Sequence, residues 1–307
     1  MSLSPRIRAF LRPPDSGRWL TLLRIGLGWE LIFYLVPLRQ DWDSLLGGPE
    51  QGLFGREIGE AMTKVQSPFI PRIGWMLWFT HRLGLSDLVT LSLVWWCLLI
   101  AACLLILGIF CRPVAIVAWF LQLASAKSGG LFSYGADNFI TIGLFYLMIA
   151  PLPDCWALDH VYRRFPIGNL YSLGFHRRVL QLHLCLIYFF SGLSKALGAN
   201  WWNGSNLWRA LTSPPYDVLP LSWVAAIGSY LPAIGISICL FETAYPFLIW
   251  WRRARYFAFY GICAMHIAIA LLMGMYLFSG IMLVLNAAAF LPNDQRTNPE
   301  AQSAPPG

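Results

Sequence analysis

The chain has 307 residues, of which 57% are hydrophobic, 15% aromatic and only 12% charged. A water-soluble domain typically carries about 25% charged residues, so this composition excludes an ordinary soluble enzyme. It indicates an all-α, polytopic membrane helical bundle, because helices satisfy their own backbone hydrogen bonds within lipid. In such a protein, a net charge of +7 indicates how the chain is oriented in the membrane rather than a nucleic-acid partner.

Eight apolar stretches approach the length of about 20 residues that a helix needs to cross a bilayer. We predict spanning helices over 19–38, 86–109, 113–128, 137–153, 178–198, 230–251, 256–274 and 276–292. The stretch 219–231 either lies in the interface or extends the sixth span.

The remaining segments are polar. Residues 1–18 form a basic N-terminus, 39–85 form a long outer loop, and 293–307 form a polar tail that we expect to be disordered.

Basic residues set the orientation, because Lys and Arg collect on cytoplasmic loops. With both termini in the cytoplasm, thirteen arginines lie inside and seven basic residues lie outside. Five of those seven are in the 39–85 loop, where five acidic residues balance them. The thirteen are Arg6, Arg8, Arg12, Arg18, Arg112, Arg163, Arg164, Arg177, Arg178, Arg252, Arg253, Arg255 and Arg296.

Common catalytic and metal motifs are missing from the sequence. Its seven cysteines lack metal or redox spacing, so we predict no metal site and no disulfide framework. No serine hydrolase or HExxH pattern occurs, and no basic patch remains for nucleic acid once the cytoplasmic arginines are assigned.

Ionisable residues within the spans are the candidate site residues, because charge in a membrane is costly and usually faces the bundle interior. These are Arg24, Glu30, His183, Lys195, Glu242 and His266. Arg24 and Glu30 are separated by about 240° around one helix, so each needs a partner from another span. His183 lies about 18 Å from Lys195 along the helix, which argues against joint action.

Glu242 precedes Pro246 by one turn, and a buried carboxyl there is either protonated or paired. His266 is either a neutral histidine with one hydrogen-bond partner or a catalytic group. Asp137 and Asn138 begin the fourth span, where they either cap the helix or line the mouth of the same pocket as Lys195.

Lys195 lies about two turns before the tryptophan pair Trp201 and Trp202, which marks the outer surface. Two interpretations are open. Its amine reaches the headgroups and has no chemical role, or burial makes it a general base.

Residues 188–211, YFFSGLSKALGANWWNGSNLWRAL, resemble the signature of the horizontally transferred transmembrane (HTTM) domain family, which includes the membrane part of vitamin K-dependent γ-carboxylase. The shared pattern is an apolar helix ending in small-Gly-x-x-Lys, a polar step, and then Trp-x-x-Gly. Residues 241–292 resemble the family's Glu-bearing span, arginine turn and His-bearing span, and 133–151 is also similar. The resemblance covers roughly 15–293, so we take 19–292 as one HTTM-like domain.

The resemblance implies that Lys195 is the catalytic base. It would deprotonate a reduced quinone of the vitamin K type, and O2 and CO2 would then take part in modifying a secreted peptide or small substrate at the outer face. Our candidates for the substrate or quinone pocket are Glu30, Asp137, Asn138, Glu242 and His266. The family has a histidine near the start of the matching fourth span, where this sequence has Asp137 and Asn138.

A second hypothesis is a non-catalytic membrane partner for the maturation of, or immunity to, a secreted peptide, with Lys195 in a structural role. A transporter is disfavoured, since no pair of broken helices occurs in matching halves. We expect a multi-pass protein of the cell membrane, in a bacterium the inner membrane, with the lipid bilayer as its solvent.

Overall fold

The protein is described by a computed structural model covering residues 4–48, 55–130, 132–162 and 164–291. Every regular element within these ranges is a helix, which confirms the all-α prediction. The eight predicted spans correspond to α2 (Arg18–Leu38), α6 (Asp87–Leu107), α7 (Cys111–Ser128), α8 (Gly135–Ile149), α10 (Leu170–Ala196), α14 (Leu231–Trp250), α15 (Arg255–Met273) and α16 (Tyr276–Phe290).

Five of these helices are long and apolar enough to cross a membrane: α2, α6, α10, α14 together with the short turn before it, and α15. The helices α8 and α16 have 15 residues each, or about 22 Å, which is short of a hydrocarbon layer of about 30 Å. The structure thus supports a membrane protein. It has five helices that are long and apolar enough to cross a membrane among the described residues, fewer than the eight spans that we predicted.

Two predicted boundaries are wrong, each for a local reason. The fifth helix begins at Leu170 rather than 178, because the Asn169 side chain accepts the Tyr171 N–H and caps the helix. The fourth helix ends at Ile149 rather than 153, because Pro151 and Pro153 cannot continue it.

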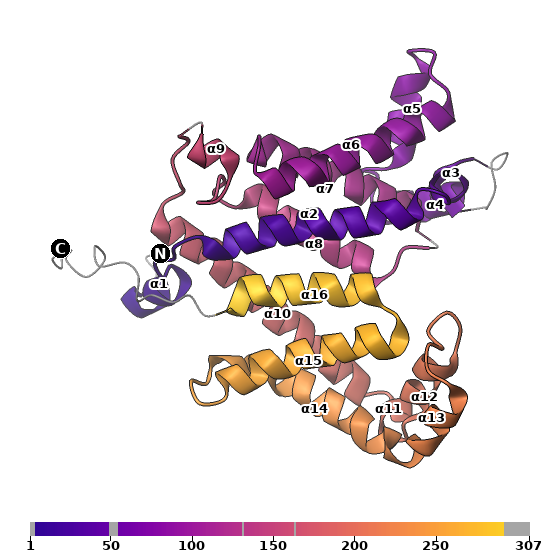
Figure 1. Ribbon diagram of the computed structural model, residues 1–307, viewed down its shortest axis with the longest axis vertical. Helices are drawn as coiled ribbons and strands as arrows, with labels where there is room; N and C mark the ends of the chain where they lie inside the picture. The colour runs from indigo at the N-terminus through magenta and orange to yellow at the C-terminus, as the bar shows by residue number, and fades with distance from the viewer. Residues whose placement is uncertain (1–3, 49–54, 131, 163, 292–307) are drawn as a thin grey trace.

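The eight long helices form two layers (Figure 1). One layer consists of α6, α2, α16 and α15, in which each helix packs on the next. The other contains α7 packed on α8, and α10 packed on α14. Because α16 contacts both α8 and α10, it joins the N-terminal half of the bundle to the C-terminal half.

Short helices cover the two ends of the bundle. One end carries α1 (Pro5–Leu11), α9 (Leu158–Val161) and the turn between α14 and α15. The other carries α3 (Trp42–Leu46), α4 (Gly55–Gln66), α5 (Ile73–His81), α11 (Ala199–Trp202), α12 (Ser205–Thr212), α13 (Leu221–Ala226) and the 3-10 turn η2 (Gly228–Tyr230). The stretch 219–231 therefore forms α13 and η2, and η2 leads into α14.

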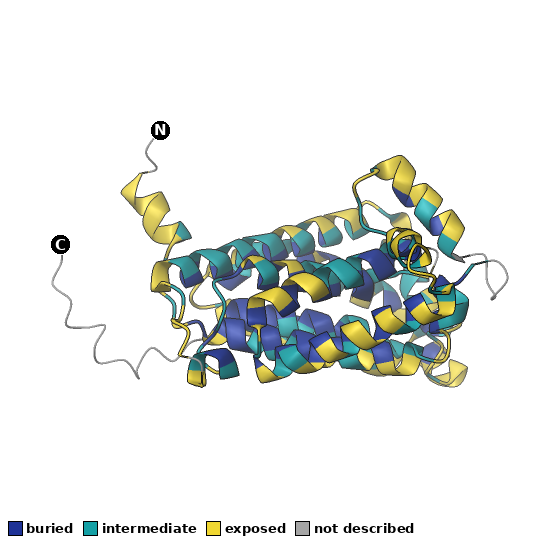
Figure 2. Cartoon of the chain, turned by 90° about the horizontal axis from the view of Figure 1, so that it is seen from above, coloured by how far each residue is buried: buried dark blue, intermediate teal, exposed yellow. Residues whose placement is uncertain are grey.

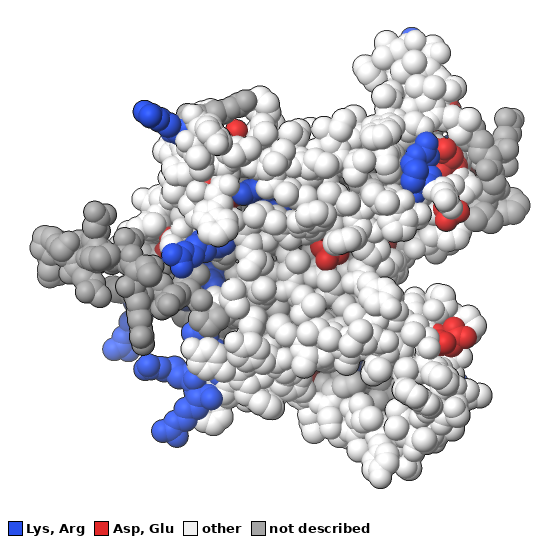
Figure 3. Space-filling view, viewed as in Figure 1, with Lys and Arg blue, Asp and Glu red and all other residues white. Residues whose placement is uncertain are grey.

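The core lies between the layers, where the residues coloured as buried collect (Figure 2). Large apolar side chains such as Trp29 and Phe33 instead point outward, at 48% and 58% exposure. Figure 3 shows Lys and Arg atoms gathered at the end that carries α1, whereas the end with α3–α5 shows both signs of charge. The predicted tail 293–307, Arg163 and Arg296 lie outside the described residues.

Candidate functional site

Lys195 lies in the last turn of α10 and forms an ion pair with Glu242 of α14. Its Nζ is 2.5 Å from Glu242 Oε2 and also donates to Ser191 Oγ at 2.6 Å. The side chain of Glu242 is 6% exposed and that of Lys195 is 22% exposed. Of the two states expected for the Glu242 carboxyl, the paired one is present, and the amine points to this partner rather than to the headgroups.

Gly192 brings the two helices together at this pair. A Cβ at this position would lie 2.5 Å from both Thr243 N and Thr243 Oγ1, and 2.9 Å from Cys239 O. Only a residue without a side chain permits this approach, so Gly192 sets the distance between the backbones that carry Lys195 and Glu242.

His266 of α15 belongs to a buried hydrogen-bond network beside the ion pair. Its Nε2 is 2.8 Å from the Tyr188 hydroxyl, which accepts a hydrogen bond from Asn286 Nδ2 at 2.6 Å. The Tyr245 hydroxyl donates to Asn286 Oδ1 at 3.0 Å. His266 Nδ1 is buried with no partner among the described residues. Tyr188 lies on α10 with Lys195 and Tyr245 lies on α14 with Glu242, so the network and the ion pair are carried by the same two packed helices.

An aromatic ring lies beside Lys195. Lys195 Nζ lies 5.5 Å from the centroid of the Trp201 ring in α11. The adjoining Leu197 and Trp202 are 81% and 49% exposed.

The other candidates lie away from Lys195. Glu30 lies between α2 and α16, where a methyl group at Gly280 would collide with its Oε1, and its Oε2 has no partner among the described residues. Asp137 lines a different pocket of about 300 Å³, together with Tyr34 and Tyr134. Lys195 is not among the residues lining that pocket.

Asp137 and Asn138 act at the start of α8. Asp137 Oδ2 accepts the Tyr134 N–H at 2.9 Å in a capping box, as the capping interpretation predicts. Asn138 is exposed and donates weakly to Tyr134 O at 3.5 Å. Burial, and then the Asp137 carboxylate, raise the pKa of the Tyr134 phenol to about 12, so this hydroxyl stays protonated.

The remaining intramembrane groups have structural partners. Arg24 binds Asp154, from the segment after α8, with Arg24 Nε 2.5 Å from Asp154 Oδ2. His183 Nδ1 is 2.9 Å from the Tyr146 hydroxyl and takes no part in the Lys195 region. Among the described residues, no cluster of three or more His, Cys, Asp or Glu side chains could hold a metal ion.

Sequence reasoning missed Tyr188, Tyr245 and Asn286. Tyr188 lies seven residues before Lys195, which places both on the same face of α10, and this spacing was the available signal. Asn286, a polar side chain in an apolar stretch, was a second signal.

Comparison of the chain with protein-family models, with curated proteins and with solved structures gives no match. The assignment of a function therefore depends on the geometry of the site and on the sequence resemblance.

Proposed function

We propose that this chain is a quinol-dependent membrane enzyme of the HTTM type that uses Lys195 as a general base at its outer face. The observation that carries the proposal is the 2.5 Å contact between Lys195 Nζ and Glu242 Oε2 at the outer end of α10. The substrate is a secreted peptide or a small molecule at that face.

The contact supplies a route to a neutral amine. A lysine must lose its proton before it can act as a base, and here the carboxylate that can take this proton is already in hydrogen-bond contact. With the proton on Glu242, the Lys195 amine can accept another from an acidic O–H of a ligand.

Two features of the site support a lipid-soluble hydroquinone as the ligand. The Trp201 ring offers an aromatic face beside Nζ, and His266 Nδ1 is a buried polar atom still without a partner among the described residues. Trp201 would hold the ring, and Lys195 would take the hydroxyl proton. A bound hydroquinone with O2 would supply the strong base needed for peptide carboxylation by CO2.

The proposal includes eight membrane crossings with both termini in the cytoplasm. The gathering of arginines at the α1 end supports this orientation. The helices α7, α8 and α16, which are less suited to crossing alone, would be sheltered by the longer helices that they contact.

The test is turnover of a vitamin K-type hydroquinone by the purified protein under oxygen. We expect formation of the oxidised quinone product by the unsubstituted chain, and loss of at least about 100-fold of that rate in Lys195→Ala, because general-base contributions are typically of this size. Turnover that is unchanged by the substitution would reject the proposal.

The Lys195–Glu242 pair also favours a second candidate, a non-catalytic partner for the maturation of, or immunity to, a secreted peptide. A buried ion pair can serve only to fix two helices, and apolar residues of similar volume can then replace it. If so, Lys195→Met with Glu242→Leu would keep full activity in cells, whereas an enzyme that needs the amine would lose it.

A further inference from the structure

A basic pocket lies at the opposite end of the molecule from Lys195, between α1 and the first turns of α10. Its volume is about 860 Å³, and its lining includes Arg8, Arg12, Tyr171, Ser172 and Phe175. None of the functions proposed above uses it. We propose that this pocket binds the headgroup of an anionic phospholipid.

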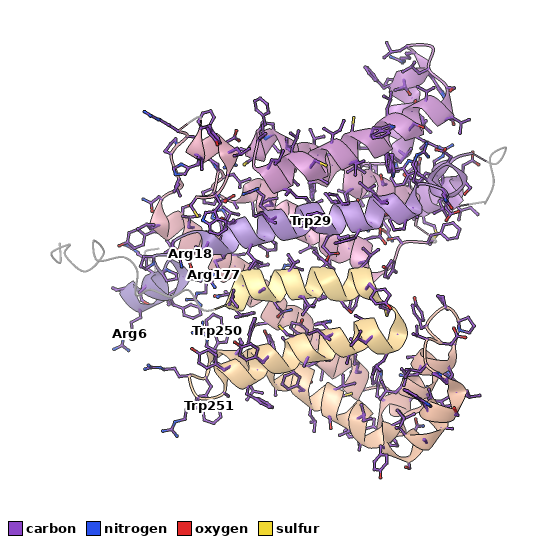
Figure 4. All side chains as sticks on the ribbon, in the orientation of Figure 1. Arg6, Arg18, Trp29, Arg177, Trp250 and Trp251 are labelled. Carbon is purple, nitrogen blue, oxygen red and sulfur yellow. The ribbon has the colours of Figure 1, made fainter. Side chains whose placement is uncertain are left out.

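The pocket exists because α1 is fixed to the end of the bundle. The Arg178 guanidinium lies between two rings, 4.6 Å from the centroid of Phe10 in α1 and 4.6 Å from that of Trp250 in α14. Arg178 Nε also donates to Phe10 O at 2.9 Å. These contacts hold α1 against the bundle at the end where Figure 4 places Arg6, Arg18, Arg177 and Trp250.

The charge in the pocket is positive and available. Arg8 and Arg12 are both exposed, and neither forms an ion pair with a described acidic residue. Both line the pocket, Arg8 from α1 and Arg12 from the residue that follows this helix. Arg12 also lies 5.5 Å from the Phe175 ring, which keeps it over the pocket. Two guanidinium groups bind a phosphate through charge-assisted hydrogen bonds.

The rest of the lining favours a lipid over a free anion. The pocket lies at the end of α10, one of the five helices able to cross a membrane, and so at the level of the headgroups. Phe175 and Ala9 give the lining an apolar part, and the neighbouring Ile7 and Phe10 of α1 are 48% and 45% exposed. The phosphate of a phospholipid can bind the arginines while the acyl chains of the same lipid run along these apolar groups, as at other interfacial helices.

The experiment measures lipid binding to the full chain purified in a neutral maltoside detergent. Native mass spectrometry and the thermal unfolding temperature would be followed while short-chain phosphatidylglycerol, short-chain phosphatidylcholine or inorganic phosphate is added. We expect phosphatidylglycerol alone to bind and to raise the unfolding temperature. Equal binding of phosphatidylcholine would overturn the proposal, and so would competition by inorganic phosphate, since the site would then accept a free anion.

Two double variants distinguish binding in the pocket from a general attraction of anionic lipid to the positive charge at this end of the molecule. Arg8→Gln with Arg12→Gln should weaken phosphatidylglycerol binding by about tenfold or more, since each arginine near a membrane surface contributes about fivefold. Arg252→Gln with Arg253→Gln removes the same charge from the turn between α14 and α15 and should change binding less than about twofold.

Equal losses in the two double variants would overturn the proposal. Arg12→Gln alone leaves α1 intact and should weaken binding by about fivefold even where the double variant fails to fold. None of these measurements depends on activity at Lys195.

Discussion

At the scale of single residues, Arg24 shows how this chain places a charge inside the bundle. The residue is 1% exposed and Asp154 is fully buried. The guanidinium also donates to the backbone oxygens of Leu105 and Ile106, at the end of α6. The pair is therefore satisfied on several sides, which is the condition under which a buried ion pair is tolerated.

Removing the carboxylate should be costly, because Arg24 would remain buried and charged. We expect Asp154→Asn to lower the free energy of unfolding by about 3 kcal/mol, measured by denaturant unfolding in detergent. The matched control is Asp43→Asn, which breaks a half-exposed pair with Arg39, at side-chain exposures of 34% and 40%, and should cost less than about 1 kcal/mol. Similar losses in the two variants would contradict this account of Arg24.

At the scale of helices, the packing of α10 on α14 creates the Lys195 region. Lys195 and Glu242 are 47 residues apart in the chain, and the missing side chain at Gly192 lets their helices approach. The hydroxyl network of Tyr188, Tyr245 and Asn286 then ties α16 to the same pair of helices. The site is a property of this contact rather than of one motif.

Gly192→Ala should therefore destabilise the protein, although alanine is the better helix former. We expect a loss of about 1–3 kcal/mol, because the added methyl group has no space against Thr243. At Gly228 a Cβ would meet only Trp208, at 3.8 Å, so Gly228→Ala should change stability by less than about 0.5 kcal/mol. Thermal unfolding of the two variants side by side tests this, and a stabilised Gly192→Ala would show that the helices are not in close contact.

At the scale of the whole molecule, the two ends of the bundle differ in their charge and in the short helices that cover them. The turn between α14 and α15 carries exposed Arg252 and Arg253, and it lies at the same end as α1. The opposite end carries α3–α5 and the turns α11–α13. The orientation that we propose places the arginine-rich end in the cytoplasm, as the positive-inside rule predicts.

This orientation predicts the pattern of labelling by a membrane-impermeant maleimide on intact cells. Gln66→Cys, an exposed position at the end of α4, should be labelled from outside. Arg253→Cys should be labelled only after the membrane is opened, and the unsubstituted chain corrects for the native cysteines. Labelling of Arg253→Cys in intact cells would contradict the proposed orientation.

The sequence by itself predicted where the eight long helices lie and how charge is distributed along the chain. Hydropathy and length are local properties, so each of the eight apolar stretches corresponds to a long helix, and the largest boundary errors fall where the Asn169 cap or Pro151 sets the helix end. The short helices α3–α5 within the 39–85 loop were not predicted. The sequence also identified Lys195, Glu242 and His266 as candidate groups, because charge within a span is costly wherever the helix lies.

Only the tertiary structure decided which of these groups meet. Helical periodicity gives the face on which a side chain lies, but not which helix packs against that face. It therefore could not pair Lys195 with Glu242, join Arg24 to Asp154 across 130 residues, or separate Asp137 from the Lys195 region. Those contacts depend on close packing between segments that are distant in sequence. Two examples are the approach of α10 to α14 at Gly192 and the position of α16 between the two halves of the bundle.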